Sequence, residues 1–432
     1  MYTTVTFRTL GCRLNQAETE TLKYLAEKAG WEVTEAAQQA DLVVINSCAV
    51  TVQAEAKTRG VIAGIHRDFP QASIIVVGCY ARREARSLLK MPGVRRVYDN
   101  RLKYQLFDDL RTCDGNSQPS VTESTDATEE VFFPTTLNLN PERIRVQLKV
   151  QDGCDYFCAY CIVPHLRGNS CSRPWQECVT EINRLVSSGI KEVVLTGVNL
   201  GNYQVADGGL EFLHDKIFAE TELPRLRLSS VEPDRVSSEL IELLRTQPRL
   251  CRHLHLPLQS GSDQILTRMR RRYATSDYAH LLETVKEQIA GVCIGADVMV
   301  GFPGEEVRDF DESLRFIETI PVDYLHVFRY SPRPGTLAAE QRDDVPACIK
   351  QERAERLRQV GQLKRQAFMQ KFIGTELSVL FEEQLGGGQW QGLSDNYMKI
   401  RVVSKENLFN SLRKVRIMSM EKDGLTGELS GA

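Results

Sequence analysis

Short, almost continuous apolar runs alternate with longer helical patterns twice along this chain, and this alternation limits the folds that the chain can adopt. In residues 1–112 the runs are TVTFRTL, ADLVVIN and ASIIVVG, and a helical pattern follows each of them. Such runs are typical of strands that helices cover on both faces of a parallel sheet. The first 112 residues therefore predict a small parallel α/β domain.

A second series of the same kind occupies residues 141–372. Its expected strands are RIRVQLKV, KEVVLTG, RLRLSS, RHLHLPL, IGADVMVG and DYLHVFRY, and helical patterns separate them, for example at 175–188, 236–246, 276–289 and 306–319. Six strand–helix units predict an α/β fold of the partial (β/α)6 barrel kind, because a complete barrel of this type needs eight.

The segment between the two series and the segment after the second series differ from both series in composition and periodicity. Residues 113–130 are rich in Ser, Thr and acidic residues without apolar periodicity, so 113–140 is expected to be a linker. After a basic helical pattern at 349–372, residues 373–432 show short alternating runs separated by glycines. This tail predicts a small all-β barrel.

Composition and charge narrow the class of protein. The chain is 42% hydrophobic and 26% charged, and it has no apolar run of the roughly 18–20 residues that a membrane helix needs. The start of the chain resembles no signal or transit peptide, so a cytoplasmic location is expected. The formal net charge is −3, which means that any contact with nucleic acid must be local.

Three of the twelve cysteines, Cys154, Cys158 and Cys161, lie on one loop directly after the first expected strand of the second series. A structural zinc site normally takes four ligands from the protein, and no matching CxxC pair follows this trio. Three thiolates suit a [4Fe–4S] cluster with one iron left open. The sequence therefore predicts a cluster whose open iron binds a substrate or a cofactor.

Cys12, Cys48 and Cys79 each follow the carboxyl end of an expected strand in the first domain. The ends of parallel strands meet at one edge of a sheet, so the three thiols can converge there. The alternative is that each is a small buried apolar residue, which free cysteine often is.

The Cys-x3-Cys-x2-Cys loop at the start of a partial parallel barrel resembles the radical S-adenosylmethionine (radical SAM) enzymes. With its leading three-cysteine domain and a tail similar to the TRAM domain, the chain as a whole resembles the methylthiotransferases. The segments TLGCRLNQAETE, NSCAVT, TGVNLGNY and YSPRPGT are most similar to the branch that acts on threonylcarbamoyladenosine in tRNA.

This resemblance implies two [4Fe–4S] clusters and S-adenosyl-L-methionine as cofactors. Cys154, Cys158 and Cys161 would hold the cluster that generates a 5′-deoxyadenosyl radical, and Cys12, Cys48 and Cys79 would hold a second cluster that carries the sulfur. The expected reaction inserts a methylthio group at C2 of N6-threonylcarbamoyladenosine at position 37, in the anticodon stem-loop. A sulfur donor and an electron donor such as flavodoxin or ferredoxin would be partners, and no membrane is involved.

The resemblance also assigns residues to the cofactor and to RNA. Arg167 or Arg173 would meet the cofactor carboxylate or a substrate phosphate, and Asn15 and Asn46 would flank the second cluster. The cofactor-binding set is Phe157, Tyr160, Thr196, Gly197, Glu232, Gln259, Ser260 and Gly301. The expected RNA contacts are Arg270, Arg271, Arg272, Lys399 and Arg401, although runs of charge are often only solvated faces.

Several alternatives stay open from the sequence. The same enzyme class includes members that act on isopentenyladenosine in tRNA or on a ribosomal protein. A radical SAM enzyme without sulfur insertion would hold one cluster, and a zinc protein that binds RNA would hold none. Iron analysis separates these, with about eight irons per chain for two clusters, about four for one and none for zinc.

Overall fold

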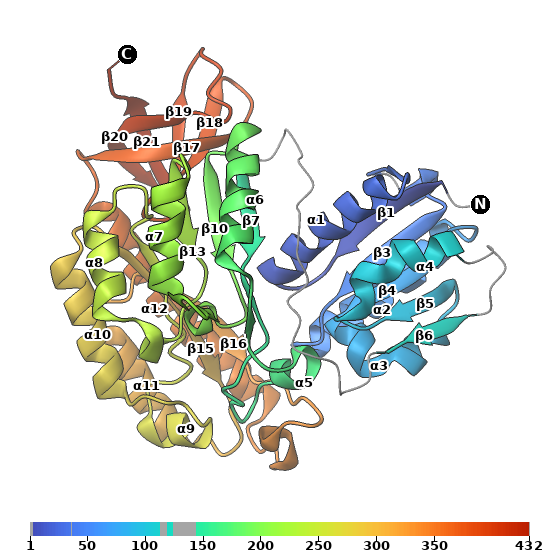
Figure 1. The fold of residues 1–432 in the computed structure, drawn as a ribbon. Helices are drawn as coiled ribbons and strands as arrows, with labels where there is room; N and C mark the ends of the chain where they lie inside the picture. Colours follow the sequence, from blue (N-terminus) through green and yellow to red (C-terminus); the bar gives the residue numbers. More distant parts are fainter. Residues whose placement is uncertain (1–2, 36, 113–118, 124–143, 432) are drawn as a thin grey trace.

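A computed structural model describes residues 3–35, 37–112, 119–123 and 144–431. It places an N-terminal α/β unit beside a larger α/β unit, and a small β-barrel at the C-terminal end of the chain caps one end of the larger unit (Figure 1). The expected division into two α/β parts and a β tail is confirmed.

The first unit is a six-stranded sheet in the order β2-β1-β3-β4-β5-β6, and every neighbouring pair is parallel. Two apolar clusters fill its two faces, one around Ile45 and Val76 and one around Val44 and Val77. The strands are β1 Thr4–Thr9, β2 Glu32–Val33, β3 Leu42–Ser47, β4 Ser73–Gly78, β5 Val94–Tyr98 and β6 Ser120–Thr122, and the helices are α1 Arg13–Lys28, α2 Val52–Asp68, α3 Cys79–Leu89 and α4 Leu106–Thr112.

Strand β6 corrects the predicted linker. Ser120–Thr122 pair in parallel with Arg96 to Tyr98 of β5, and Val121 packs against the apolar cluster of the sheet. A three-residue strand has too little periodicity to stand out from a Ser/Thr-rich segment, so only the sheet edge reveals it. The rest of the predicted linker, 113–118 and 124–140, lies outside the described residues.

The second unit has the six expected parallel strands. They form two three-stranded sheets, β13-β10-β7 and β14-β15-β16, which single bridges Leu226–Leu250 and Ser230–His255 join into one curved layer. The strands are β7 Arg145–Lys149, β10 Glu192–Thr196, β13 Arg225–Leu228, β14 His253–His255, β15 Cys293–Val300 and β16 Tyr324–Arg329. The partial (β/α)6 barrel is therefore confirmed.

Helices cover the outside of this curved layer, and short ribbons flank its strand ends (Figure 1). The helices are α5 Val163–Arg167, α6 Trp175–Ser187, α7 Leu210–Glu220, α8 Ser238–Thr246, α9 Asp263–Arg268, α10 Thr275–Gln288, α11 Val307–Thr319 and α12 Ala347–Gln370. The ribbons are β8 Gln151–Asp152 with β9 Cys171–Ser172, and β11 Gln204–Val205 with β12 Gly208–Gly209.

The C-terminal unit is a closed barrel in the order β17-β18-β19-β21-β20. Its core includes Trp390 and also Phe368 and Met369 of α12, so the long helix is part of its packing. The strands are β17 Glu376–Gln384, β18 Gln389–Ser394, β19 Lys399–Val403, β20 Leu412–Glu421 and β21 Gly424–Leu429.

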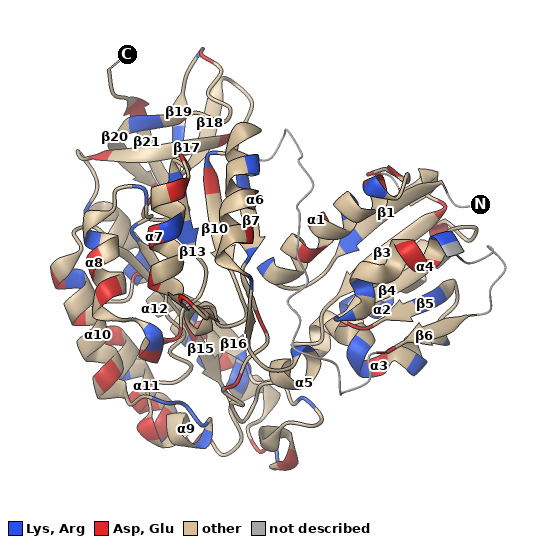
Figure 2. Ribbon diagram, viewed as in Figure 1, with Lys and Arg blue, Asp and Glu red and all other residues tan. Residues whose placement is uncertain are grey.

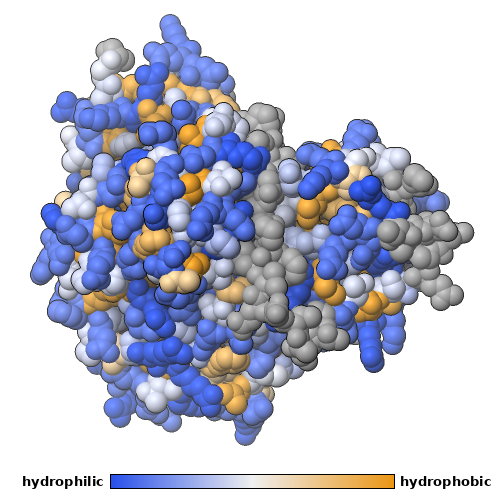
Figure 3. Space-filling view, in the orientation of Figure 1, coloured by the Kyte–Doolittle hydropathy of each residue, from blue (hydrophilic) through white to orange (hydrophobic). Residues whose placement is uncertain are grey.

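The surface carries no extended region of one character in the drawn orientation. Basic and acidic residues are interspersed over α8, α10 and α11 in Figure 2, and Figure 3 shows a mostly hydrophilic face with small, separate hydrophobic patches. Within the described ranges, no helix is both long and apolar enough to cross a membrane.

Candidate metal-cluster and substrate site

The loop with Cys154, Cys158 and Cys161 follows β8 at the carboxyl end of the first barrel strand. The Cys161 amide donates to the Cys158 carbonyl at 2.9 Å, and the Ala159 amide donates to the Met269 carbonyl at 3.0 Å. Phe157, which was predicted to contact the cofactor, has a positive φ of 48° and is 44% exposed. Its side chain therefore lies on the outer side of the loop. The backbone therefore holds the three thiols on one short turn.

Arg271 ties this loop to the next strand end. Its guanidinium donates to Cys158 Sγ at 3.2 Å and forms an ion pair with Glu232, and its side chain is only 2% exposed. Arg271 was expected to contact RNA, but the structure directs it inward, and an RNA contact would require it to leave Glu232. Arg270 and Arg272 stay exposed.

The other predicted cofactor residues all follow the carboxyl ends of barrel strands. Thr196 is the last residue of β10, Gly197 follows it, and Gln259 and Gly301 both take positive φ values, 69° and 72°. Gly301 is required there, because a Cβ atom would lie 2.3 Å from Lys350. The Ser260 hydroxyl is buried beside Ser313 at 3.4 Å.

The structure also brings together Cys12, Cys48 and Cys79 at the corresponding edge of the first sheet. Ser47 pairs with Gly78, which places the following residues Cys48 and Cys79 next to each other. A Cβ atom on Gly11 would lie 2.9 Å from Cys48 Sγ, so glycine at this position lets the turn before Cys12 approach Cys48.

Amide side chains surround this trio. Asn15 donates to the Ser47 carbonyl at 3.0 Å, and its side-chain oxygen accepts from the Cys12 thiol at 3.6 Å. Asn100 donates to Cys79 Sγ at 3.3 Å. Asn46 instead donates to the Asn15 carbonyl at 2.9 Å. Asn15 and Asn100 thus form hydrogen bonds with cysteine sulfur atoms, and no sequence pattern points to Asn100.

Each trio offers three thiols, a donor set that suits a [4Fe–4S] cluster with one iron left open. Burial raises the pKa of Cys48 and Cys154 to about 11 and that of Cys161 to about 12, so iron binding must displace thiol protons.

Helix α5 connects the two trios. It begins two residues after Cys161, and Ile162 and Leu166 pack into the same apolar cluster as Cys79. Asn100, which donates to Cys79, also donates to the Leu166 carbonyl at 3.3 Å. The two cysteine trios therefore lie at opposite ends of a helix of five residues.

An ionic cluster of Glu18, Lys103, Lys149, Asp152 and Arg167 fixes α5 against the first unit. Glu18 has no exposed side-chain surface, and its carboxylate lies 2.6 Å from Lys103, 3.1 Å from Lys149 and 2.9 Å from Arg167. Burial opposes ionisation of Glu18, but these three cations outweigh it and hold its pKa well below the usual range.

The segment YSPRPGT makes a second connection. Arg333 donates to the Ala49 carbonyl at 3.2 Å and to Glu55 at 2.8 Å, and Ser331 accepts from the Val52 amide at 3.2 Å. The barrel thus holds the residues immediately after Cys48 through the segment YSPRPGT. The sequence of this segment alone does not indicate that role.

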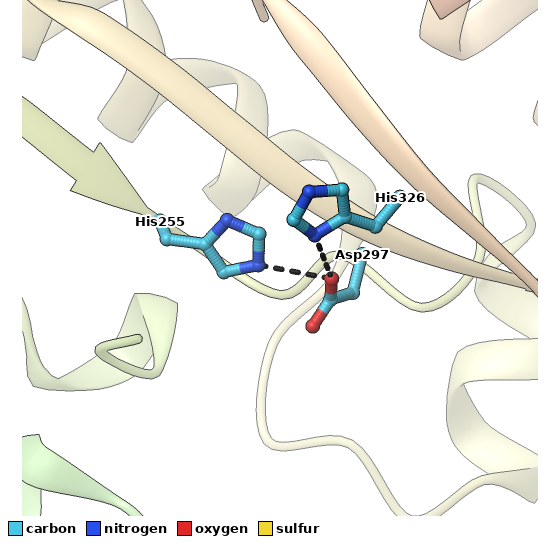
Figure 4. A group of neighbouring side chains, drawn as sticks. All are labelled: His255, Asp297 and His326. Carbon is cyan, nitrogen blue, oxygen red and sulfur yellow. Dashed lines mark ion pairs between the residues drawn. The ribbon is translucent and has the colours of Figure 1, made fainter. Parts of the chain in front are cut away.

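The inner side of the barrel holds a group that sequence reasoning missed, formed by His255, Asp297 and His326 (Figure 4). His255 Nε2 and His326 Nδ1 lie 2.9 Å and 3.3 Å from the same Asp297 oxygen. Burial opposes ionisation of Asp297, but both imidazoles outweigh it and lower its pKa. The three residues lie on β14, β15 and β16, and their shared inward direction could have been read from strand alternation.

The expected RNA-binding residues outside this centre differ in their surroundings. Arg272 lies over the Tyr156 ring at 3.9 Å and donates to the Asp155 carbonyl at 3.1 Å. Arg401 is paired with Glu421 at 2.6 Å and with Asp423 at 3.1 Å, whereas Lys399 is exposed. A phosphate would have to compete with two carboxylates for Arg401.

Comparisons with known proteins match both α/β units. Residues 4–98 match the family described as "Uncharacterized protein family UPF0004", and residues 148–317 match the radical SAM superfamily. A solved structure of the radical S-adenosylmethionine methyltransferase TsrM from Kitasatospora setae, with cobalamin and a [4Fe-4S] cluster bound, superimposes with a TM-score of 0.57 at 16% identity, covering 78% of this chain and 77% of that one. At that identity the likeness concerns the fold alone.

Curated relatives match almost the whole length. The threonylcarbamoyladenosine tRNA methylthiotransferase MtaB of Bacillus subtilis is 34% identical over 96% of this chain and 94% of its own, and the protein of that name in Aquifex aeolicus is 36% identical over 92% and 96%. The tRNA-2-methylthio-N(6)-dimethylallyladenosine synthase of Cereibacter sphaeroides is 33% identical over 98% of both chains. The names of these relatives therefore share one reaction class, methylthiolation of tRNA, and differ in the nucleoside, threonylcarbamoyladenosine or dimethylallyladenosine.

Proposed function

This chain belongs to the radical SAM methylthiotransferases of tRNA, and we propose that its substrate is N6-threonylcarbamoyladenosine at position 37, methylthiolated at C2. The observation that carries the proposal is the connection of two cysteine trios through one short helix. Cys161 precedes α5, and Arg167 at the end of α5 reaches Asn15 at 3.0 Å, beside Cys12. A reaction that needs two cofactor centres on one substrate requires this proximity.

The choice of nucleoside is supported by resemblance in the motifs around the clusters. TLGCRLNQAETE, NSCAVT, TGVNLGNY and YSPRPGT are most similar to the threonylcarbamoyladenosine branch. Relatives with that name are 32–36% identical and relatives named for dimethylallyladenosine are 33% identical, so the motifs, and not the identities, carry the choice. The alternative substrate is therefore isopentenyladenosine at the same tRNA position.

Membership in the family implies a [4Fe–4S] cluster and S-adenosylmethionine, which together supply a carbon-centred radical able to take hydrogen from the substrate. Cys154, Cys158 and Cys161 would hold that cluster. Arg271 holds Cys158 and Glu232 in fixed positions, and Glu232 would accept hydrogen bonds from ribose hydroxyls. Thr196, Gly197, Gln259, Ser260 and Gly301 would complete the cofactor rim, with Phe157 and Tyr160 beside it.

We assign Cys12, Cys48 and Cys79 to a second [4Fe–4S] cluster that carries the sulfur. Asn100 would donate a hydrogen bond toward the Cys79 ligand and so tune the cluster, whereas Asn15 places its amide oxygen, an acceptor, beside Cys12. A sulfur donor and a small electron-transfer protein such as flavodoxin or ferredoxin would serve the two centres. Arg270, Arg272 and Lys399 are the exposed cations that would meet the anticodon stem-loop.

The test is mass analysis of tRNA nucleosides after anaerobic incubation with reconstituted protein, reductant and S-adenosylmethionine. We expect 2-methylthio-N6-threonylcarbamoyladenosine from tRNA that carries the threonylcarbamoyl group. Product only from isopentenyladenosine tRNA would refute the assigned substrate while keeping the reaction class. Iron analysis of the same sample should give about eight irons per chain, and about four would remove the second cluster.

A further inference from the structure

We infer that a small cationic cavity, where the first unit and the C-terminal barrel meet the inner face of the partial barrel, binds the carboxylate of the threonylcarbamoyl group, with Arg13 as the residue that recognises it. This inference rests on the function proposed above and extends it to substrate specificity. The threonylcarbamoyl group carries a carboxylate, a hydroxyl and a ureido linkage, whereas an isopentenyl group is an uncharged hydrocarbon. A site that separates the two substrates should therefore recognise negative charge.

The cavity has a volume of about 60 Å³ and is lined by Arg13, Arg145, Gln147, Val194, Arg227 and Tyr397. All three units of the protein contribute: α1 of the first unit, neighbouring strands of the larger unit, and the turn between β18 and β19. Gln147, Val194 and Arg227 are direct partners on β7, β10 and β13, so their side chains lie on one face of the sheet. This volume has room for a few water molecules, and a carboxylate group is of comparable size.

Arg13 is the cation in this cavity that has no carboxylate partner among the described residues. Its guanidinium donates to the Tyr397 hydroxyl at 2.7 Å and lies 5.9 Å from the centre of that ring. Arg227, by contrast, is already paired with Glu192 at 2.7 Å, and Arg145 with Glu382 at 3.2 Å. An incoming carboxylate can therefore pair with Arg13 without displacing an internal ion pair.

Gln147 supplies the second observation. Its amide nitrogen donates to Gln16 Oε1 at 3.1 Å, while its own oxygen is buried and has no hydrogen-bond partner. A buried acceptor without a donor is costly, and a ligand that brings an N–H or O–H group would satisfy it. The ureido and hydroxyl groups of the threonylcarbamoyl substituent are donors of this kind.

The cavity also lies beside the cysteine trio of the first unit, Cys12, Cys48 and Cys79. Arg13 follows Cys12 directly in the chain and is the first residue of α1. Tyr397 is held by its contacts with the barrel, because its ring stacks on His253 at 4.3 Å and its carbonyl accepts from Arg365 at 2.6 Å. A carboxylate bound at Arg13 would thus hold the N6 substituent close to the assigned sulfur-carrying centre.

The experiment compares three stem-loop RNAs that differ only at position 37: the threonylcarbamoyl acid, its neutral methyl ester, and isopentenyladenosine. Reconstituted full-length protein is assayed anaerobically for kcat/KM, and the Kd of each RNA is measured by fluorescence anisotropy. The wild type should prefer the acid over the ester by about ten- to a hundredfold, since a hydrogen bond to a charged group has that worth. Arg13→Gln should bring this ratio close to one, mainly through KM and Kd, and Arg13→Lys should restore part of it.

Arg315→Gln is the matched control, because Arg315 is an exposed arginine of α11 far along the chain from the cavity. It should leave the acid-to-ester ratio at the wild-type value. If Arg13→Gln lost iron or structure, Tyr397→Phe would decide, since it removes the hydroxyl that orients Arg13 and should lower the same ratio.

The inference is overturned if the wild type treats acid and ester alike, or if Arg13→Gln slows both RNAs equally and keeps the ratio. Either result leaves the proposed function intact, because the acid would still be methylthiolated. Methylthiolation of the isopentenyl RNA alone would refute the proposed substrate itself and this inference with it.

Discussion

Replacing Glu18 by Gln should destabilise the contact between the first unit and the barrel by about 3–5 kcal/mol. The Glu18 carboxylate is fully buried and is shared by Lys103, Lys149 and Arg167. The substitution keeps the shape of the side chain but leaves Lys149 and Arg167 with Asp152 as their remaining carboxylate in this cluster, and Lys103 with the neutral Asn100 oxygen. Removing one partner of a buried ion pair costs this amount because the other charge stays desolvated.

The measurement is urea unfolding of cluster-free protein, followed by tryptophan fluorescence. The chain has three tryptophans, Trp31, Trp175 and Trp390, and one lies in each structural unit. The first transition should move to lower urea in Glu18→Gln. The exposed pair of Glu242 with Arg245 provides a matched control, and Glu242→Gln should leave the first transition nearly unchanged, because solvent screens that pair.

A double substitution sharpens the test. Lys103 is also fully buried, and burial lowers its pKa to about 8 despite the nearby Glu18 carboxylate. The double variant Glu18→Gln with Lys103→Met also removes the Lys103 charge that Glu18→Gln leaves buried without its carboxylate. It should therefore recover part of the stability that Glu18→Gln loses. Equal transitions for Glu18→Gln and Glu242→Gln would refute the reasoning that this ionic cluster holds the two units together.

Three further predictions concern the clusters and the barrel core. Cys158→Ala should abolish 5′-deoxyadenosine formation. Cys48→Ala should still cleave S-adenosylmethionine but should not methylthiolate the tRNA. Normal sulfur insertion by the Cys48 variant, measured by nucleoside mass analysis, would contradict the second cluster. Gly11→Ala should lower the iron content by about four per chain, because the added methyl would lie 2.6 Å from Cys48 Cβ at a φ of 106°. Burial lowers the pKa of His214 to about 4, so the unfolded chain takes up its proton first as the pH falls below about 6.5. The wild type should therefore lose about 3 kcal/mol of stability from this residue between pH 7 and pH 4, and His214→Leu should lose less over the same range in urea titrations.

The architecture could be predicted because its signals are local. Near-continuous apolar runs identified β1, β3 and β4 and all six barrel strands. A strand of a parallel sheet that is covered on both faces needs apolar residues at consecutive positions, and this pattern can be read within a few residues. Strand β6 lies in a segment whose sequence predicts a linker, because three residues at a sheet edge carry almost no periodicity. The order β17-β18-β19-β21-β20 of the small barrel also follows only from the tertiary structure, because it depends on which strands pair.

Residues whose roles depend on tertiary packing could not be predicted. Arg271 belongs to a run of arginines that reads as a surface charge patch, yet it is buried between Cys158 and Glu232. Asn100 and Arg333 carry no motif signal of a link between the units, and His255, Asp297 and His326 are far apart in the chain. Each of these roles depends on which elements pack together.

The sequence by itself determined the chemistry available to this protein: six cysteines at strand ends and on one loop, and a framework of parallel strands that presents them. Only the tertiary structure decided that the two trios share the helix α5, that Arg271 faces inward, and that Arg13 meets Tyr397 in a cavity built from three units. The physical reason is range. Burial patterns and ligand spacing are properties of a few consecutive residues, whereas the pairing of charges depends on contacts between residues hundreds of positions apart.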